Sequence, residues 1–553
     1  MRIKSILVAS LALFAGALTS CNKGSDEINK VEEGNTYASV TLSFGENDFR
    51  ADDEVNDFNP KGEWEGNDAI KTVDVYLVDA AKVSSGQYTL TDFNVEAVAG
   101  QETKLMPKKA IKTTAGDKNV YVLVNAPDEI RQTLAVTTKA DFETAWAKIY
   151  EAHNVAANTK AYPTKSAEGM MKLAKLDGDG KDIIMMSNEK LYTFNVKENV
   201  TYEQAMDTAA PKNRAIVPVK RAAARVVVTT SELQYDITNP TTNKIIGTIS
   251  DITYAVAQGE KKLHIQQLID NGIIKTPAYD IITNPFVKPG SYNSMNDFYD
   301  YSDLFVKDRS VIKSDYASLD AKMIGELQKP AFMLEANHKR NTPAGNTPAT
   351  YDGGFFRSNT PYVLVRTKFK PTQDALAENN VLADLPADGT FYVGSVTGKI
   401  YTSAANVYDP AKGGLKGQTY RKYVKGKVLY YAYVNPDIIE RPKTLNAPVF
   451  RNNVYHVHIR AIKALGFNWN PLYPEDPDTT DPNWNGDPND PNAPVNPDPR
   501  PNKENPSDPN DPGEDPTTPV KPDDPLGDKD IYMSVSVKVL KWNVHSYEVD
   551  LGL

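Results

Sequence analysis

One stretch of this chain cannot form a folded core, and its position constrains what the rest can do. Residues 471–525 hold 17 of the 37 prolines, mostly in Asp-Pro and Asn-Pro pairs with almost no large apolar side chains. Such a composition cannot bury enough apolar surface to pack. A relaxed spacer of this length spans ~40 Å, and a fully extended one ~170 Å. The segment after it can therefore reach another molecule.

That segment, residues 533–553, is strongly strand-forming. The pair Val539 and Leu540 shifts its alternation, so Trp542 and Val544 continue on the opposite face, and a bulge or a crossing between two domains is expected there. Trp542 is either an anchor for insertion into a partner or a core residue of its own subunit. Before the shift, apolar residues alternate with small or polar ones: Met533, Val535, Val537 and Val539.

A second strand of the same pattern lies near the start, at residues 37–44. Its Ser39, Thr41 and Ser43 point to the opposite face from the apolar residues. A polar stretch around Arg50 follows and is expected to be an exposed loop. Each strand could be an ordinary amphipathic strand of its own sheet. Alternatively, the two strands could both fit the same groove. The apolar residues of the first strand are Ala38, Val40, Leu42 and Phe44.

The chain begins with an export signal. Arg2 and Lys4 precede an apolar run at residues 6–18, which is too short to span a bilayer. The run closes with Leu-Thr-Ser-Cys21, which resembles a bacterial lipobox, whose cysteine is acylated. Cys21 could instead be an incidental residue of a signal peptide cleaved elsewhere. It is the one cysteine of the chain, so no disulfide is expected.

Between these ends the pattern predicts an all-β fold. Two helices are expected, at residues 140–153 and 318–328, and a division between two domains near residue 215. Many short strands with few helices favour β-sandwich domains over an alternating βα fold. The further candidate strands are 72–78, 119–124, 225–229, 249–256, 362–369, 427–434 and 454–462.

Enzyme signatures are missing. The sequence contains no GxSxG elbow, phosphate-binding GxxxxGK[ST] loop or HExxH motif. We therefore expect no catalytic residues and no cofactor. The net charge is −10 and the basic residues are scattered, so nucleic acid is not an expected partner.

Two groups of residues raise the question of a metal. Asp177, Asp179 and Asp182 in LDGDGKD suggest a calcium loop, but its sixth and twelfth positions do not fit an EF-hand, and a solvated turn is favoured. His456 and His458 share one face of a strand without an identifiable third ligand. A packed or hydrogen-bonded histidine pair is favoured, and no metal site is expected.

The two alternating strands together suggest donor-strand exchange. A protease that cuts after Arg50 could release the first strand, and the spacer could carry the tail to a neighbour. Loss of residues 38–44 would leave unpaired backbone groups and exposed apolar side chains. Burial of the tail's six apolar side chains would contribute roughly 10–18 kcal/mol before ordering costs.

Several segments, which cover the chain from end to end, carry a resemblance to a known family. They are GEWEGNDAIKTVDVYLV (62–78), PKKAIK (107–112), AVAQGEKK (255–262), YVLVRTKF (362–369), KYVKGKVLYYAYVNP (422–436), FRNNVYHVHIRAIKALGFNWNPLYP (450–474) and MSVSVKVLKWNVHSYEVDL (533–551). In these segments the chain resembles the FimA/Mfa-type fimbrilin family of Bacteroidetes-type bacteria, and within it most closely the major stalk subunits of the Mfa (short) fimbriae.

The resemblance implies two transthyretin-like β-sandwich domains and a lipoprotein precursor of the outer membrane. An arginine-specific protease would cut between Arg50 and Ala51, and a neighbour's C-terminal strand would enter the vacated groove to build a surface fimbria. The expected segments are a signal peptide (1–20), a propeptide with the exchangeable strand (21–50), two domains (51–215 and 216–470), a spacer (471–530) and a donor strand (531–553).

The implied partners are other copies of the chain, accessory anchor and tip subunits, the maturation protease, and receptors on host or bacterial surfaces. A long donor segment suits a stalk subunit, because a tip subunit has no need to donate a strand. The alternative is a monomeric, lipid-anchored surface protein that binds glycan or peptide. It predicts that the tail folds back onto its own domain.

Overall fold

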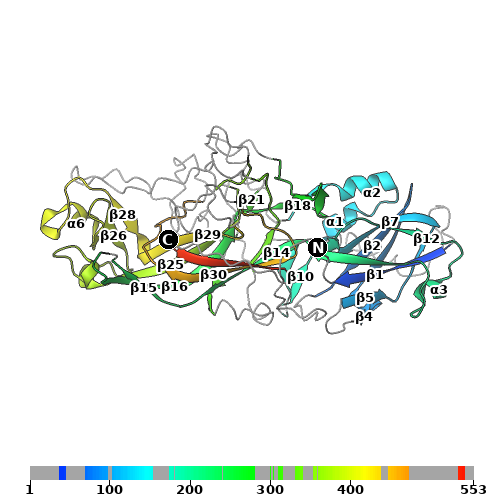
Figure 1. Ribbon diagram of the computed structural model, residues 1–553, viewed down its shortest axis with the longest axis horizontal. Coiled ribbons are helices and arrows are strands. Elements are labelled where there is room, and N and C mark those ends of the chain that lie inside the picture. The colour runs from blue at the N-terminus through cyan, green and yellow to red at the C-terminus, as the bar shows by residue number, and fades with distance from the viewer. Residues whose placement is uncertain are drawn as a thin grey trace, which may run out of the picture.

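The computed structural model is built mainly of β-sheet with few helices, which confirms the all-β expectation (Figure 1). Two groups of sheets lie side by side along the long axis, one from each half of the chain. The structure describes residues 36–44, 69–96, 103–152, 173–177, 179, 181–239, 241–280, 299–300, 303, 309–314, 331–340, 353–357, 359–436, 446–472 and 533–541.

The first half forms one 10-stranded sheet in the order β3-β2-β7-β11-β13-β1-β5-β4, with β12 paired to β7 and β6 to β1. The first strand of the chain therefore lies inside this sheet. The bounds are β1 Thr36–Phe44, β2 Val73–Val78, β3 Val83–Tyr88, β4 Phe93–Glu96, β5 Thr103–Pro107, β6 Ile111–Thr113, β7 Gly116–Val124, β11 Met186–Asn188, β12 Tyr192–Val196 and β13 Arg214–Arg221.

Alternation along β2 shows how this sheet is buried on both faces. Val73 and Val75 point into a cluster that also holds the apolar side chains of β1. Tyr76 and Val78 point the other way, into a cluster with the helical residue Phe142. Because successive side chains of a strand face opposite sides, one strand contributes to both cores.

The helices are short: α1 Asp128–Thr133, α2 Lys139–Trp146, α3 Tyr202–Met206 and α6 Ala404–Tyr408. The start of α2 is capped by Thr138, whose Oγ1 accepts a hydrogen bond from the Asp141 amide at 3.2 Å. The helix expected at 140–153 was wrong at its end, because β8 (Ile149–Glu151) pairs with β18 (Lys262–His264). The helix expected at 318–328 lies outside the described residues.

The second half packs two sheets face to face, in the orders β23-β14-β30-β31 with β24 on β14, and β15-β16-β25-β29 with β22 on β16. Apolar residues of both sheets share one buried cluster, as in a sandwich. The bounds are β14 Ala223–Thr230, β15 Tyr235–Thr238, β16 Ile245–Ala257, β22 Arg309–Ser310, β23 Ile312–Lys313, β24 Ala331–Leu334, β25 Tyr362–Pro371, β29 Lys427–Tyr433, β30 Asn453–Ile462 and β31 Met533–Lys541.

Smaller elements fill the connections. They are β9 Ala174–Leu176, β10 Asp182–Ile184, β17 Gly259–Glu260, β19 Leu268–Asp270, β20 Ile273–Lys275, β21 Tyr299–Asp300, β26 Phe391–Gly394, β27 Ile400–Tyr401 and β28 Tyr420–Tyr423, with 3-10 turns η1 Leu90–Asp92, η4 Gln373–Ala375, η5 Leu382–Asp384, η6 Pro410–Lys412 and η7 Val424–Gly426.

The change from the first group of sheets to the second falls at Ala222, between β13 and β14. The expected division at 215 thus lies within β13, which belongs to the first sheet. Leu472, which lies within the segment expected as the spacer, is buried in the second half. The remaining candidate strands are observed, each extended or trimmed by a few residues at its ends.

A buried ion pair ties the two halves together. Arg225 of β14 contacts both carboxylate oxygens of Asp182 in β10, at 2.8 and 2.7 Å, and both residues are buried. Both carboxylate oxygens of Asp182 therefore face the Arg225 guanidinium. Asp177 forms the expected turn, since its Oδ1 accepts hydrogen bonds from the amides of Asp179 and Lys181.

We predict that Asp182→Ala destabilises the chain by ~3–5 kcal/mol, because it leaves the Arg225 guanidinium buried without its carboxylate. The midpoint of urea unfolding measures the loss. The double variant Asp182→Leu/Arg225→Met should lose less. As a control, Asp374→Ala breaks the exposed pair with Lys244 and should shift the midpoint little. Equal shifts for Asp182→Ala and Asp374→Ala would contradict this account.

Candidate functional site

The groove that holds β1 is the structural feature that the sequence singled out. On one side β1 runs parallel to β13, from Ser39 opposite Arg214 to Ser43 opposite Pro218. On the other side it runs antiparallel to β6 through its first residues and to β5 through its last ones. The strand is thus hydrogen-bonded along both of its edges, and its departure would leave both rows of backbone groups unpaired.

The apolar side chains of β1 fill the interior of the first half. Ala38, Val40 and Leu42 are fully buried in the cluster they share with β2 and β7, and Phe44 packs partly buried at its margin. Burial of Val40 and Leu42 contributes ~1.5–3 kcal/mol each. The structure therefore brings together all four of the residues expected to be released.

A network of polar contacts holds the beginning of β1. The Thr36 hydroxyl donates to the Lys197 carbonyl at 2.7 Å and accepts from the Val200 amide at 3.1 Å. The Asn213 side-chain amide donates to the Tyr37 carbonyl at 3.0 Å. These partners lie about 160–180 residues further along the chain, so no local motif of the sequence predicted them.

The tail strand β31 pairs antiparallel with β30 of its own chain (Figure 1). Met533 is buried in the core of the second half, and β31 is the last strand of its sheet. Val535, Val537 and Val539 lie opposite Ile459, Val457 and Tyr455. Unlike β1, this strand is paired on one side alone among the strands that the structure describes.

Of the two alternatives expected at Val539 and Leu540, a bulge or a crossing between domains, the bulge was wrong. Pairing continues without interruption from Val539 to Lys541, and the irregularity lies instead on β30, between Ile459 and Ala461. Trp542 and Val544 lie outside the described residues, as do Cys21, Arg50 and Ala51.

The two histidines pack against each other, with ring centroids 5.9 Å apart, and are hydrogen-bonded to one shared threonine. The Thr229 hydroxyl of β14 lies 2.6 Å from His456 Nε2 and 2.7 Å from His458 Nδ1, and both rings are buried. His458 Nε2 contacts the Ser231 hydroxyl at 2.9 Å. Among the described residues, no three His, Cys, Asp or Glu side chains come together as a metal site. The helices described are all too short or too polar to cross a membrane.

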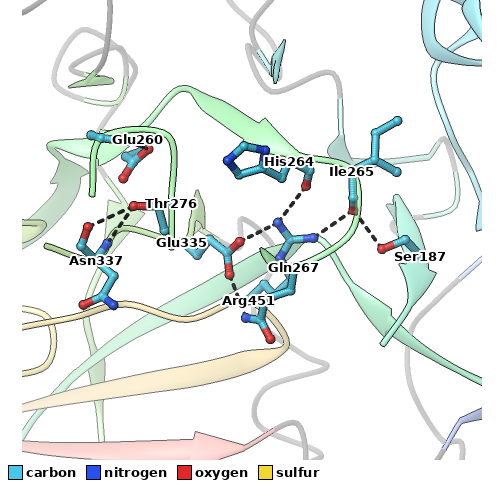
Figure 2. Close-up of polar contacts among 10 residues, drawn as sticks. Ser187, Glu260, His264, Ile265, Gln267, Thr276, Glu335, Asn337 and Arg451 are labelled. Carbon is cyan, nitrogen blue, oxygen red and sulfur yellow. Dashed lines mark hydrogen bonds and ion pairs between the residues drawn. The ribbon is translucent and has the colours of Figure 1, made fainter. Parts of the chain in front are cut away.

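Sequence reasoning missed a buried polar network at the junction of the two halves (Figure 2). Arg451 donates to the carbonyls of His264 and Ile265 at 2.9 and 3.0 Å and forms a 2.5 Å ion pair with Glu335. Ser187, from the first half, donates to the same Ile265 carbonyl at 2.8 Å. The bonded partners are 78 to 187 residues apart along the chain, which is why spacing gave no signal.

Glu260 lies beside this network and has no basic partner among the described residues. Its Oε2 accepts a hydrogen bond from the Ala278 amide at 3.2 Å, and burial raises the pKa of its carboxyl group well above 4.5. Thr276 connects it to Asn337, whose carbonyl accepts a bond from the Thr276 hydroxyl at 2.9 Å. The network contains no nucleophile and base in contact, so we assign it a structural role.

Comparison with known proteins shows which class of protein the chain resembles. The family described as "Major fimbrial subunit protein type IV, Fimbrillin, C-terminal" matches residues 421–548, which include β29, β30 and the tail strand. This family consists of fimbrial structural subunits and not of enzymes.

Full-length relatives then identify the family for the whole chain. Two proteins named "Minor fimbrium subunit Mfa1", from Porphyromonas gingivalis, are each 30% identical over 555 residues, which is 98% of this chain and of the relative. The chain belongs to the fimbrillin family.

Solved structures show weaker similarity. A fimbrilin (FimA) of Porphyromonas gingivalis W83 has 13% identity and a TM-score of 0.34, covering 78% of this chain and 92% of that one. A cell adhesion protein of Parabacteroides distasonis has 12% identity and a TM-score of 0.37, covering 78% and 94%.

We predict that Glu260→Gln stabilises the chain at neutral pH. The folded state raises the pKa of Glu260 above 4.5. Above pH 4.5 the folded chain therefore keeps a proton on Glu260 that the unfolded chain loses. The free energy of unfolding of the wild type then falls as the pH rises, by up to ~1.4 kcal/mol per pH unit. Glutamine does not ionise, so the Glu260→Gln variant lacks this pH-dependent loss of stability. Urea unfolding from pH 4 to 8 should show a growing advantage of Glu260→Gln.

The matched control is Glu335→Gln, which removes the carboxylate paired with Arg451. It should destabilise at neutral pH, because the guanidinium stays buried. A constant difference between Glu260→Gln and wild type across this pH range would mean that Glu260 does not change its charge on unfolding.

Proposed function

We propose that the chain is the stalk subunit of an adhesive surface fimbria, exported as a lipoprotein acylated at Cys21. Cleavage after Arg50 frees the segment that contains β1, and the tail of a second copy then enters the groove. Repetition of this exchange builds the filament. Membership of the fimbrillin family supports the fimbrial role.

The two-sided position of β1 is the observation that carries the proposal. A strand that completes the core of a domain ends at Phe44, only six residues before Arg50. One cut in that interval converts β1 from part of the chain into a bound peptide. The groove between β13 on one side and β5 with β6 on the other then accepts a replacement of the same kind.

The pairing of the tail gives the exchange a direction. Among the described strands of its own chain, β31 is hydrogen-bonded to β30 alone, whereas the vacated groove offers partners on both edges. A strand that moves from a sheet edge into a central position gains a second row of backbone hydrogen bonds. The spacer supplies the length that the move requires.

The partners follow from this assembly. They are other copies of the chain along the filament, accessory anchor and tip subunits at its ends, an arginine-specific protease during maturation, and receptors on the surfaces to which the fimbria adheres. The mature subunit is placed in a fimbrium at the cell surface and the precursor at the outer membrane. The proposal includes no cofactor, metal or nucleic acid.

One observation favours the alternative of a monomeric, lipid-anchored binding protein for glycan or peptide. The tail folds back onto β30, and Met533 lies in the core of its own chain. In that case the tail completes its own fold, and cleavage after Arg50 has no role in assembly.

We predict that limited arginine-specific digestion of the lipid-free precursor produces polymers whose chains begin at Ala51. Light scattering follows the mass, and N-terminal sequencing identifies the cut. Arg50→Lys keeps the positive charge but removes the protease site, so this variant should stay monomeric. A stable monomer that begins at Ala51 would contradict donor-strand exchange.

We predict that removal of residues 533–553 abolishes polymerisation but leaves a folded chain, because β31 is an edge strand whose loss disrupts one row of pairing. After the arginine-specific cut, the truncated subunit should bind a synthetic peptide of residues 531–553. The uncut truncated precursor, whose groove still holds β1, is the control and should not bind it. Loss of circular dichroism on truncation would favour the monomeric alternative.

A further inference from the structure

The groove contains a recognition site for one particular side-chain pattern. Its wall is formed by α3 and by Arg214, the first residue of β13. The helix α3 packs against β1 (Figure 1). The Tyr37 ring meets the Tyr202 ring edge-on, with centroids 5.6 Å apart and planes at 84°. The Tyr37 amide donates to the Val200 carbonyl at 3.1 Å.

Two residues further along, the fully buried Ser39 side chain contacts the half-buried Arg214. Arg214 Nε donates to the Ser39 hydroxyl at 2.9 Å, and that hydroxyl donates to the Ala205 carbonyl at 3.1 Å. Arg214 Nη2 contacts the same carbonyl at 3.0 Å. The site therefore needs a small side chain that both accepts and donates a hydrogen bond, which serine does.

Departure of β1 would break this arrangement. Arg214 Nε would lose its acceptor and the Ala205 carbonyl one of its donors, in a place that an incoming strand shields from water again. An apolar side chain at this position would leave both groups unsatisfied, and a lysine would face a guanidinium. The site thus discriminates among replacement strands, and among registers of one strand.

The tail carries the matching pattern. Residues 37–40 read Tyr-Ala-Ser-Val and residues 532–535 read Tyr-Met-Ser-Val, with the same spacing from tyrosine to serine. We propose that Tyr532 and Ser534 of one copy take the places of Tyr37 and Ser39 in the next, so that α3 and Arg214 fix the register of the donor strand. This inference rests on the proposed donor-strand exchange.

Neighbouring registers fit the groove less well. A shift of two residues one way places Ser536 in the Ser39 site but Ser534 at the position of Tyr37, so the contact with the Tyr202 ring is lost. Lys538 then falls at Thr41 and in the proposed register at Ser43, and both positions are buried. A shift of two the other way places the large ring of Tyr532 at the fully buried position of Ser39. A strand running as β1 does is also parallel to β13 and antiparallel to β5, as the vacated backbone groups require.

The proposed register places Val535 and Val537 where Val40 and Leu42 lie, which conserves the character of the core. Met533 replaces Ala38 and is larger. An unbranched, flexible side chain is the type that adapts best to such a position, but the groove must open slightly around it. Recognition therefore depends more on the sites for the tyrosine and serine side chains than on the size of the side chain at the position of Ala38.

Disulfide trapping in the polymer tests the register. Cleavage after Arg50 removes Cys21, the one cysteine of the chain, so the mature subunit is a cysteine-free background. Leu42 lies opposite Leu105 of β5, and the proposed register brings Val537 of the donor to that place. Leu105→Cys is combined in turn with Met533→Cys, Val535→Cys, Val537→Cys and Val539→Cys.

After oxidation of the cut subunits, a non-reducing gel should show a ladder of linked subunits for Val537→Cys and not for the other three. A ladder for Val535→Cys or Val539→Cys would overturn the proposed register. A ladder for Met533→Cys would overturn the proposed direction of the donor strand. In either case donor-strand exchange itself would stand. Failure of the wild-type chain to polymerise after the cut would overturn both the proposed function and this inference.

The role of the serine is tested with Ser534→Val and its matched control Ser536→Val, which falls at Thr41. Within the described residues no hydrogen bond of the Thr41 side chain is seen, whereas the Ser39 hydroxyl has two partners. We expect Ser534→Val to slow polymer growth by about tenfold or more, the effect of one lost buried hydrogen bond. Ser536→Val should change the rate little.

A measurement in trans separates recognition from folding of the tail. Synthetic peptides of residues 531–553, with serine or valine at position 534, are added to cut subunits truncated before residue 533. The serine peptide should bind about tenfold more tightly, and Arg214→Met should abolish the difference. Equal affinity of the two peptides would overturn the assignment of Ser534.

Discussion

Backbone hydrogen bonding along both edges of β1 is the constraint on which the first half of the molecule depends. The sheet has its strand order because β1 bridges β13, which comes late in the sequence, to β5 and β6, which come early. Without β1 these strands would form two separate edges over an open core. A strand of nine residues from the beginning of the chain therefore completes a structure built by about 150 residues that follow it.

The connection between the halves depends on a different interaction. Buried charges at the junction are paired: Asp182 with Arg225, and Glu335 with Arg451. Arg451 also binds carbonyls of the segment that pairs with β8, so the second half reaches into the first. Paired charges in a dry interface tolerate little relative displacement, because each loses its partner when the surfaces slide. The junction thus holds the halves in one arrangement.

The local sequence pattern predicted where the strands lie. It was less successful for features that depend on contacts with distant segments. Alternation identified β1. Short runs rich in β-branched and aromatic residues identified β2, β25, β29 and β30, which are buried along most of their length. The local pattern failed at Ile149, where an apparent helical face continues past Trp146 but β18 captures the chain as a strand. It also placed a bulge at Val539 that tertiary pairing moves onto β30. In each case a contact distant in sequence overrode a weak local preference.

The sequence by itself determined which segments form strands, which of their faces are apolar, that the tail follows a spacer unable to fold, and that β1 and the tail share one pattern. The tertiary structure alone decided that β1 lies between β13 and β5, that the tail rests on β30, and that Ser39 meets Arg214. The reason is physical. Side-chain alternation specifies a face, whereas strands pair through backbone groups that nearly every residue carries, so the choice of neighbour emerges only when the whole core is packed.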